Sequence, residues 1–144
     1  MVFDSLDTLN WPAVGAAVAA AFVIGLLWFS PQVLGPFWAR QVSRYTALPE
    51  GEITNEASRP TALSAWLGVI AVSAVALAVT AEAVGADSPS DGIVLGLVLG
   101  LGLGATLASW PPIFARMPWQ WWLVNSGAFV LMQVAMGTIL GAWS

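Results

Sequence analysis

The chain has 144 residues, of which 58% are hydrophobic and only 8% are charged, and its formal net charge is −4. A soluble domain averages roughly 25% charged residues, so this composition excludes an ordinary soluble protein and is typical of a membrane protein. The absence of cysteine and histidine excludes disulfides, thiolate chemistry and histidine ligation of haem or (bacterio)chlorophyll.

Successive apolar stretches are each long enough to cross a hydrocarbon core of about 30 Å as an α-helix. The four predicted spans cover about 11–30, 61–86, 92–110 and 119–143. Proline marks their ends, since Pro12 lies in the first turn of span one, Pro31 ends that span, and Pro111 follows span three. Short connections make up the rest. The sequence therefore predicts one all-α domain, residues 1–144, of four transmembrane helices.

The segment between the first two spans is predicted to contain a short amphipathic helix. On a helical wheel of residues 37–48, large apolar side chains share one side: Phe37, Trp38, Val42, Tyr45 and Leu48. Arg40 and Arg44 lie on the other side. This pattern favours a helix in the membrane interface, and the alternative is a solvated loop that contains aromatic residues. The polar residues 49–60 are expected to form a flexible loop.

The charged residues set an expected orientation. All the basic residues lie in loops 31–60 and 111–118: Arg40, Arg44, Arg59 and Arg116. Aspartates mark the other side: Asp4, Asp7, Asp87 and Asp91. Because basic loops stay in the cytoplasm, both termini are expected outside. Tryptophans near the span ends are expected to anchor the chain at the interfaces: Trp11, Trp28, Trp38, Trp110 and Trp143.

Small residues recur at four-residue spacing in two spans. Span three carries a glycine row, a pattern called a glycine zipper: Gly92, Gly96, Gly100 and Gly104. Span one carries a milder row: Ala13, Ala17, Ala21 and Gly25. Such rows let helix backbones approach closely, and the two spans run in the same direction, so a close parallel crossing between them is expected. Packing within the chain is favoured over contact with a second subunit.

Span four has a polar side that carries Asn125 and Gln133, eight residues apart. In hydrocarbon their amides are expected to hydrogen-bond to a neighbouring helix. Candidate partners are hydroxyl groups of spans two and three: Ser73, Thr80, Thr106 and Ser109. The alternative is that the two amides line a polar transport pathway.

Glu82 is the ionisable residue that lies within a predicted span. It is five residues from Asp87, so it is expected at the outer interface in contact with water. Intramembrane acids can relay protons, and a proton- or cation-handling role is the alternative.

The sequence contains no triad, metal-ligand cluster or phosphate loop, so neither catalysis nor a cofactor is expected. Four arginines are too sparse for a nucleic-acid surface. The leading hypothesis is a non-catalytic helix-packing or accessory subunit of a homo-oligomer or larger membrane complex, with the lipid bilayer and other membrane subunits as partners. The alternatives are a small transporter or channel, and binding of a lipid or pigment between the Trp-rich helix ends.

Longer strings at both ends of the chain are more specific than these patterns. They are Leu9-Asn10-Trp11, GLLWFSPQVLGPFW from Gly25 to Trp38, and WQWWLVNSGAFVLMQVAMGTILGAW over residues 119–143. They resemble the prokaryotic four-span membrane proteins of domain of unknown function 1761, with Pro36 in place of the usual basic residue. The resemblance implies a multi-pass protein of the prokaryotic cytoplasmic (inner) membrane, and it implies no established activity or catalytic residues.

Overall fold

The computed structural model describes residues 6–143, which form helices and loops without a strand. Within these residues, four helical segments are long and apolar enough to cross a membrane: α1 (Trp11–Trp28), α4 (Pro60–Val84), the segment Pro89–Phe114, and α7 (Trp119–Ala142). The predicted all-α, four-span architecture is therefore confirmed, with span ends that shift by up to four residues. Asp4 lies outside the described residues.

The local chemistry of the chain explains where these helices begin and end. The Asn10 side chain accepts a hydrogen bond from the Ala13 amide at 3.2 Å and caps α1. α4 begins with Pro60, whose missing amide hydrogen is harmless in the first turn. It ends at Gly85, which has a φ of +68° and so takes the left-handed conformation that glycine tolerates best.

The third membrane segment is not one regular helix. It consists of α5 (Pro89–Leu99), the π-helix η2 (Gly100–Ala105) and the short helix α6 (Trp110–Phe114). The prediction that Pro111 and Pro112 end the span was wrong. They lie in the first turn of α6, where the chain needs no intrahelical amide donors, and the helical segment continues to Phe114.

Two short helices connect α1 to α4. The predicted amphipathic helix is present as α2 (Gly35–Thr46). The expected flexible loop 49–60 was wrong, because it contains α3 (Glu50–Ala57), which packs against α2. Glu50 and Glu52 lie in the first turn of α3, where the helix dipole favours acids, and Ile53 buries its side chain.

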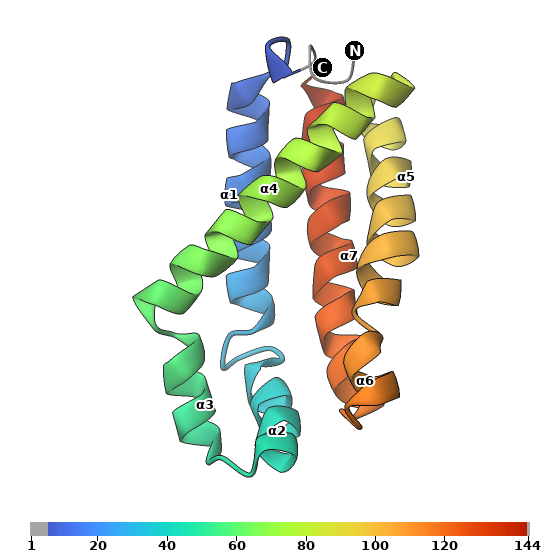
Figure 1. Ribbon diagram of the computed structural model, residues 1–144. Helices are drawn as coiled ribbons and strands as arrows, with labels where there is room; N and C mark the ends of the chain where they lie inside the picture. The colour runs from blue at the N-terminus through green and yellow to red at the C-terminus, as the bar shows by residue number, and fades with distance from the viewer. Residues whose placement is uncertain (1–5, 144) are drawn as a thin grey trace.

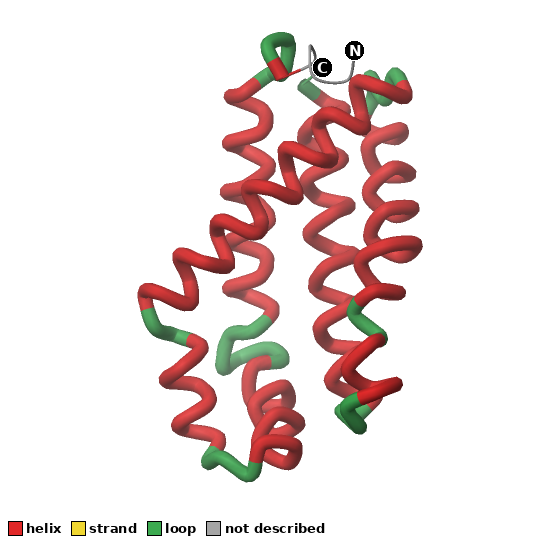
Figure 2. Tube along the Cα trace, viewed as in Figure 1, coloured by secondary structure: helices red, strands yellow, loops and turns green. Residues whose placement is uncertain are grey.

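The spans form a bundle in which α7 lies between α1 and α5, while α4 crosses in front at a steep angle (Figure 1). The core is formed by α1, α4 and α7, with Leu77 and Met136 as its largest fully buried side chains. Asn10 and Trp143, near the first and last described residues, are hydrogen-bonded to each other at one end of the bundle, here called the terminal end (Figure 1). The helices α2, α3 and α6 and their loops lie at the other end, here called the arginine end because Arg40, Arg44, Arg59 and Arg116 belong to it (Figure 2).

Candidate functional site

The glycine row of span three packs against α7. A Cβ atom at Gly92 would collide with the carbonyl oxygen of Gly137, and one at Gly96 would lie 2.5 Å from the carbonyl oxygen of Gln133. One at Gly100 would lie 3.0 Å from the Cα of Val130. The two backbones therefore approach closely from Gly92 to Gly100, about two helical turns. Close packing of this kind provides dispersion and weak C–H···O contacts, which stabilise helix pairs in lipid.

The expected parallel crossing between the rows of spans one and three was wrong, because α7 separates α1 from α5. The sequence interpretation missed that α7 carries small residues of its own, Gly137 and Gly141, which face the glycine row and the start of α5. Their four-residue spacing was the signal that could have identified this antiparallel pair. Gly104 does not share the close approach, since its nearest neighbours would be 3.8 Å from an added Cβ.

The row on α1 is buried inside the same bundle. Ala17 and Ala21 have exposed fractions of 0%, and both belong to the core with residues of α4 and α7. Gly25 provides the space for the indole ring of Trp66 from α4, because a Cβ there would overlap that ring. Both small-residue rows thus contact helices of the same chain, as the sequence favoured, although with different helices from those expected.

The two amides of α7 have different environments. Gln133 donates a hydrogen bond from Nε2 to the Ser73 Oγ at 2.7 Å, and Ser73 of span two is one of the four candidate partners named from the sequence. Its Oε1 is buried without a partner among the described residues. Asn125 does not reach a neighbouring helix as expected. Its Nδ2 donates to the carbonyl oxygen of Trp121 at 2.8 Å, one turn earlier in the same helix.

Two tryptophans hold helices together through their indole N–H groups. Trp28 donates to the Val124 carbonyl oxygen at 3.0 Å, and its ring lies against Gly127. Trp122 donates to the carbonyl oxygen of Ala105, the last residue of the π-helix, at 2.8 Å. The sequence gave no signal for this second bond, because the π-helix that presents the carbonyl was not predicted.

The other tryptophans predicted as interface anchors lie near the ends of the bundle. Trp110 and Trp143 expose 62% and 52% of their surface, and Trp11 exposes 51%. Trp38 differs, because its Nε1 is buried without a hydrogen-bond partner among the described residues. Exposed indoles at helix ends fit the enrichment of tryptophan at membrane–water interfaces.

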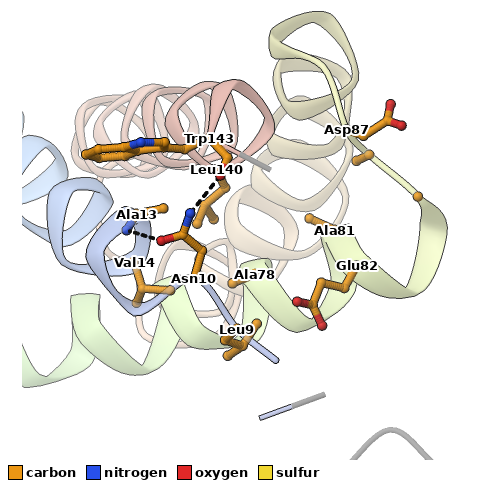
Figure 3. A pocket seen from close by; sticks show the side chains of 12 residues that line it. Leu9, Asn10, Ala13, Val14, Ala78, Ala81, Glu82, Asp87, Leu140 and Trp143 are labelled. Atoms are coloured by element: carbon orange, nitrogen blue, oxygen red, sulfur yellow. Dashed lines mark hydrogen bonds between the residues drawn. The ribbon is translucent and has the colours of Figure 1, made fainter. Parts of the chain in front are cut away.

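A pocket of about 260 Å³ opens at the terminal end, between the ends of α1, α4 and α7 (Figure 3). Its walls are mostly apolar side chains: Leu9, Ala13, Val14, Ala78, Ala81 and Leu140. Glu82 lies on its rim as an exposed residue and accepts a hydrogen bond from the Thr8 Oγ1 at 3.2 Å. The sequence placed Glu82 at this interface, whereas the pocket itself depends on three helix ends that are distant in sequence.

A hydrogen bond between Asn10 and Trp143 stabilises one side of the pocket. The Asn10 Nδ2 donates to the carbonyl oxygen of Trp143 at 2.7 Å, while its Oδ1 caps α1 (Figure 3). One side chain therefore fixes the start of α1 to the end of α7. Among residues 6–143, no group of three or more Asp or Glu side chains is close enough to hold a metal ion.

The polar groups are held apart by these contacts. Asn125 and Gln133 are separated by about 12 Å along α7, and Asn125 bonds within α7 whereas Gln133 bonds to Ser73 of α4. Glu82 is bonded to the segment before α1 at the terminal end. The printed contacts of these three side chains do not join them into one chain of hydrogen bonds.

Comparison with known proteins gives a family match. A family model described as "Protein of unknown function (DUF1761)" matches residues 12–141. No curated protein and no solved structure is significantly similar to the chain.

Proposed function

The chain belongs to the DUF1761 family, and we propose, from the packing of α4, that it is a non-catalytic, helix-packing subunit of a homo-oligomeric membrane assembly. The contact surface in this proposal is the outward side of the first half of α4, here called the α4 face, and it consists of exposed residues: Ser64, Ala65, Gly68, Val69 and Val72. The occupant of this face is a second copy of the chain.

The observation that carries the proposal is the separation of α4 from its own bundle. Its buried residues begin at Ile70, and within residues 60–69, all of which the structure describes, none is buried. The ring of Trp66 attaches this half to α1, where it lies against Gly25 and Phe22. Figure 1 shows α4 leaning away from α7 toward its start. A span that packs so little within its own chain has a large surface available to a neighbour.

Gly68 supports the choice of this face. A glycine inside a helix costs about 1 kcal/mol relative to alanine, and close helix contact can offset that cost. The glycines at 92, 96 and 137 have such a contact inside the chain, whereas no described atom lies within 4 Å of an added Cβ at Gly68. Gly15 and Gly102 are equally open, but Gly68 differs because none of residues 60–69 around it is buried.

A second copy fits the α4 face better than an unrelated partner does. In a two-fold dimer each subunit presents the same patch, so the patch must be complementary to itself. A surface of small and β-branched side chains without charge meets this condition, because two such helices can cross closely. The α4 face contains no charged residue, so it does not require a partner of opposite charge.

Disulfide cross-linking tests this contact directly, because the chain has no cysteine of its own. Gly68→Cys is expected to give a disulfide-linked dimer in native membranes under mild oxidation. Leu107→Cys is the matched control. Leu107 is 74% exposed, and it lies about as many residues from the arginine end of span three as Gly68 does from that end of α4. Native mass in mild detergent should fall to that of a monomer in Gly68→Leu. The homo-oligomer is contradicted if the wild-type protein has the native mass of a monomer and Gly68→Cys forms no disulfide-linked dimer. It is also contradicted if Gly68→Cys forms a disulfide with a different polypeptide.

The proposal includes a location and an orientation. The arginine end faces the cytoplasm and the terminal end faces outward in a prokaryotic inner membrane, because basic loops are retained in the cytoplasm. The separation of the four arginines from both chain ends supports this orientation.

The transporter or channel hypothesis receives less support. A pathway needs polar groups that follow one another across the membrane, and Asn125 and Gln133 are each bonded elsewhere. The transporter or channel hypothesis would be supported if the wild-type protein conducts a solute or ion across liposome membranes and a folded Gln133→Leu protein does not.

A further inference from the structure

The pocket at the terminal end combines an apolar interior with a negative rim. Figure 3 shows Leu9 from the segment before α1, with Ala13 and Val14 of α1 and Leu140 of α7, around the same pocket as Ala78 and Ala81 of α4. The Glu82 carboxylate lies at the opening, near Leu9, whereas the Asp87 side chain points away from the interior. A ligand complementary to this pocket has an apolar body and a positively charged head.

The distribution of charge along the chain strengthens this complementarity. The chain has no lysine, and its four arginine side chains all belong to the arginine end. Glu82 therefore meets no Lys or Arg side chain among the residues that line the pocket, and no such cation offsets its charge there. A cation at the rim gains Coulomb energy that the low-dielectric walls beneath it screen less than bulk water does.

The size and construction of the pocket limit the ligand. Ligand pockets usually have volumes of roughly 300–1,000 Å³, so a pocket of about 260 Å³ accepts a small molecule and not a two-chain lipid body. The Asn10–Trp143 hydrogen bond holds the ends of α1 and α7 in place, so the site is formed before a ligand arrives. Such preorganisation lowers the entropy cost of binding.

We propose that the pocket between α1, α4 and α7 binds a small cationic amphiphile, with its ammonium head on the Glu82 carboxylate and its alkyl group against Val14 and Leu140. This site is independent of the α4 face, because its residues lie at the terminal end of the bundle and the α4 face belongs to the first half of α4. Oligomer formation and ligand binding can therefore fail separately.

The test is calorimetric titration of the full-length protein in a non-ionic maltoside detergent with hexyltrimethylammonium. Two matched probes separate the contributions of charge and tail: the uncharged carbon isostere of that cation, and hexanoate. We expect binding of the cation, weaker binding of the isostere by about tenfold, and no binding of hexanoate. Equal affinity for the cation and the isostere, or no binding of the cation, overturns the proposal.

Variants identify the carboxylate responsible. Glu82→Gln is expected to weaken hexyltrimethylammonium by about tenfold and to leave the isostere unchanged. Asp87→Asn is the matched control, since it removes one charge at the rim without touching the interior, and its effect should be about twofold or less. Helicity and the melting temperature of each variant report whether it folds. A folded Glu82→Gln protein that binds the cation like the wild type overturns the assignment.

The same ammonium chemistry is present in free amines and in lipid head groups. Short-chain dihexanoyl-phosphatidylcholine added to the titration distinguishes the two sources. We expect it to compete at least tenfold more weakly than hexyltrimethylammonium, because its two chains exceed the pocket volume. If dihexanoyl-phosphatidylcholine competes at a concentration equal to or lower than that of hexyltrimethylammonium, the ligand is a lipid head group and not a free amine.

Discussion

Gly92 and Gly137 lie so close together that a methyl group on either would collide with the carbonyl oxygen of the other. This contact joins the start of span three to the last third of span four, and Gly96 and Gly141 extend it on either side. The backbones of two antiparallel helices approach closely here. The loop that connects them is at the arginine end, so the glycines fix the far ends of the two helices.

Gly137→Ala is expected to lower the free energy of unfolding by about 1–3 kcal/mol, because the added methyl forces α5 and α7 apart. Gly15→Ala is the control, since nothing among the described residues lies within 4 Å of an added Cβ there. The control should be neutral or stabilising by up to about 1 kcal/mol. Unfolding in mixed detergent by sodium dodecyl sulfate measures both. Equal effects of the two substitutions would show that the Gly92–Gly137 approach does not stabilise the fold.

The Gln133–Ser73 hydrogen bond at 2.7 Å links spans four and two, and we expect it to contribute modestly. Interhelical bonds in membranes average about 0.6 kcal/mol in double-mutant cycles. A cycle of Gln133→Leu and Ser73→Ala should give a coupling energy of that size. Gln133→Leu alone should lower the free energy of unfolding by less than the coupling energy. The reason is that this substitution also removes the buried Oε1, which has no hydrogen-bond partner among the described residues. A coupling energy of zero contradicts the bond.

Trp122→Phe is expected to destabilise the protein by about 1 kcal/mol and to increase amide exchange in residues 100–109. The reason is that the indole N–H satisfies the Ala105 carbonyl at the end of the π-helix. Trp110→Phe is the control, because Trp110 is 62% exposed and its ring pairs with Phe114 of the same helix. Unchanged exchange in the Trp122→Phe protein would show that the bond does not hold the π-helix.

The proposed orientation can be measured with single cysteines in this cysteine-free chain. Asp87→Cys should react with a membrane-impermeant maleimide in intact cells, because the loop at the terminal end faces outward. Glu52→Cys in α3 should react only after the membrane is opened. Reactivity in the reverse order would invert the topology and the assignment of the arginine end to the cytoplasm.

Much of the architecture could be predicted from the sequence because single-helix properties determine it. The length of each apolar stretch predicts a span, and the positions of Pro60 and Gly85 mark where α4 begins and ends. The amphipathic pattern of residues 37–48 predicts α2 for the same reason. The need to satisfy an amide in hydrocarbon predicted that Gln133 bonds to a neighbouring helix, with Ser73 as one of four candidate partners.

The same reasoning was wrong where the outcome depends on a partner. Asn125 was expected to bond to another helix, but the Trp121 carbonyl one turn away is an equivalent acceptor that needs no neighbour. α3 was expected to be a loop, because its short amphipathic pattern is weak without the α2 surface against which it packs.

The sequence by itself determined the number of spans, their approximate ends, the separation of the arginines from the chain termini, and the presence of rows that require close helix contact. Only the tertiary structure decided that the glycine row faces Gly137 of α7, that span three contains a π-helix, and that three helix ends enclose a pocket beside Glu82. The physical reason is that hydropathy and helix-end signals act within one segment. A small residue specifies how near another backbone can come, and the packing of the whole bundle specifies which backbone that is.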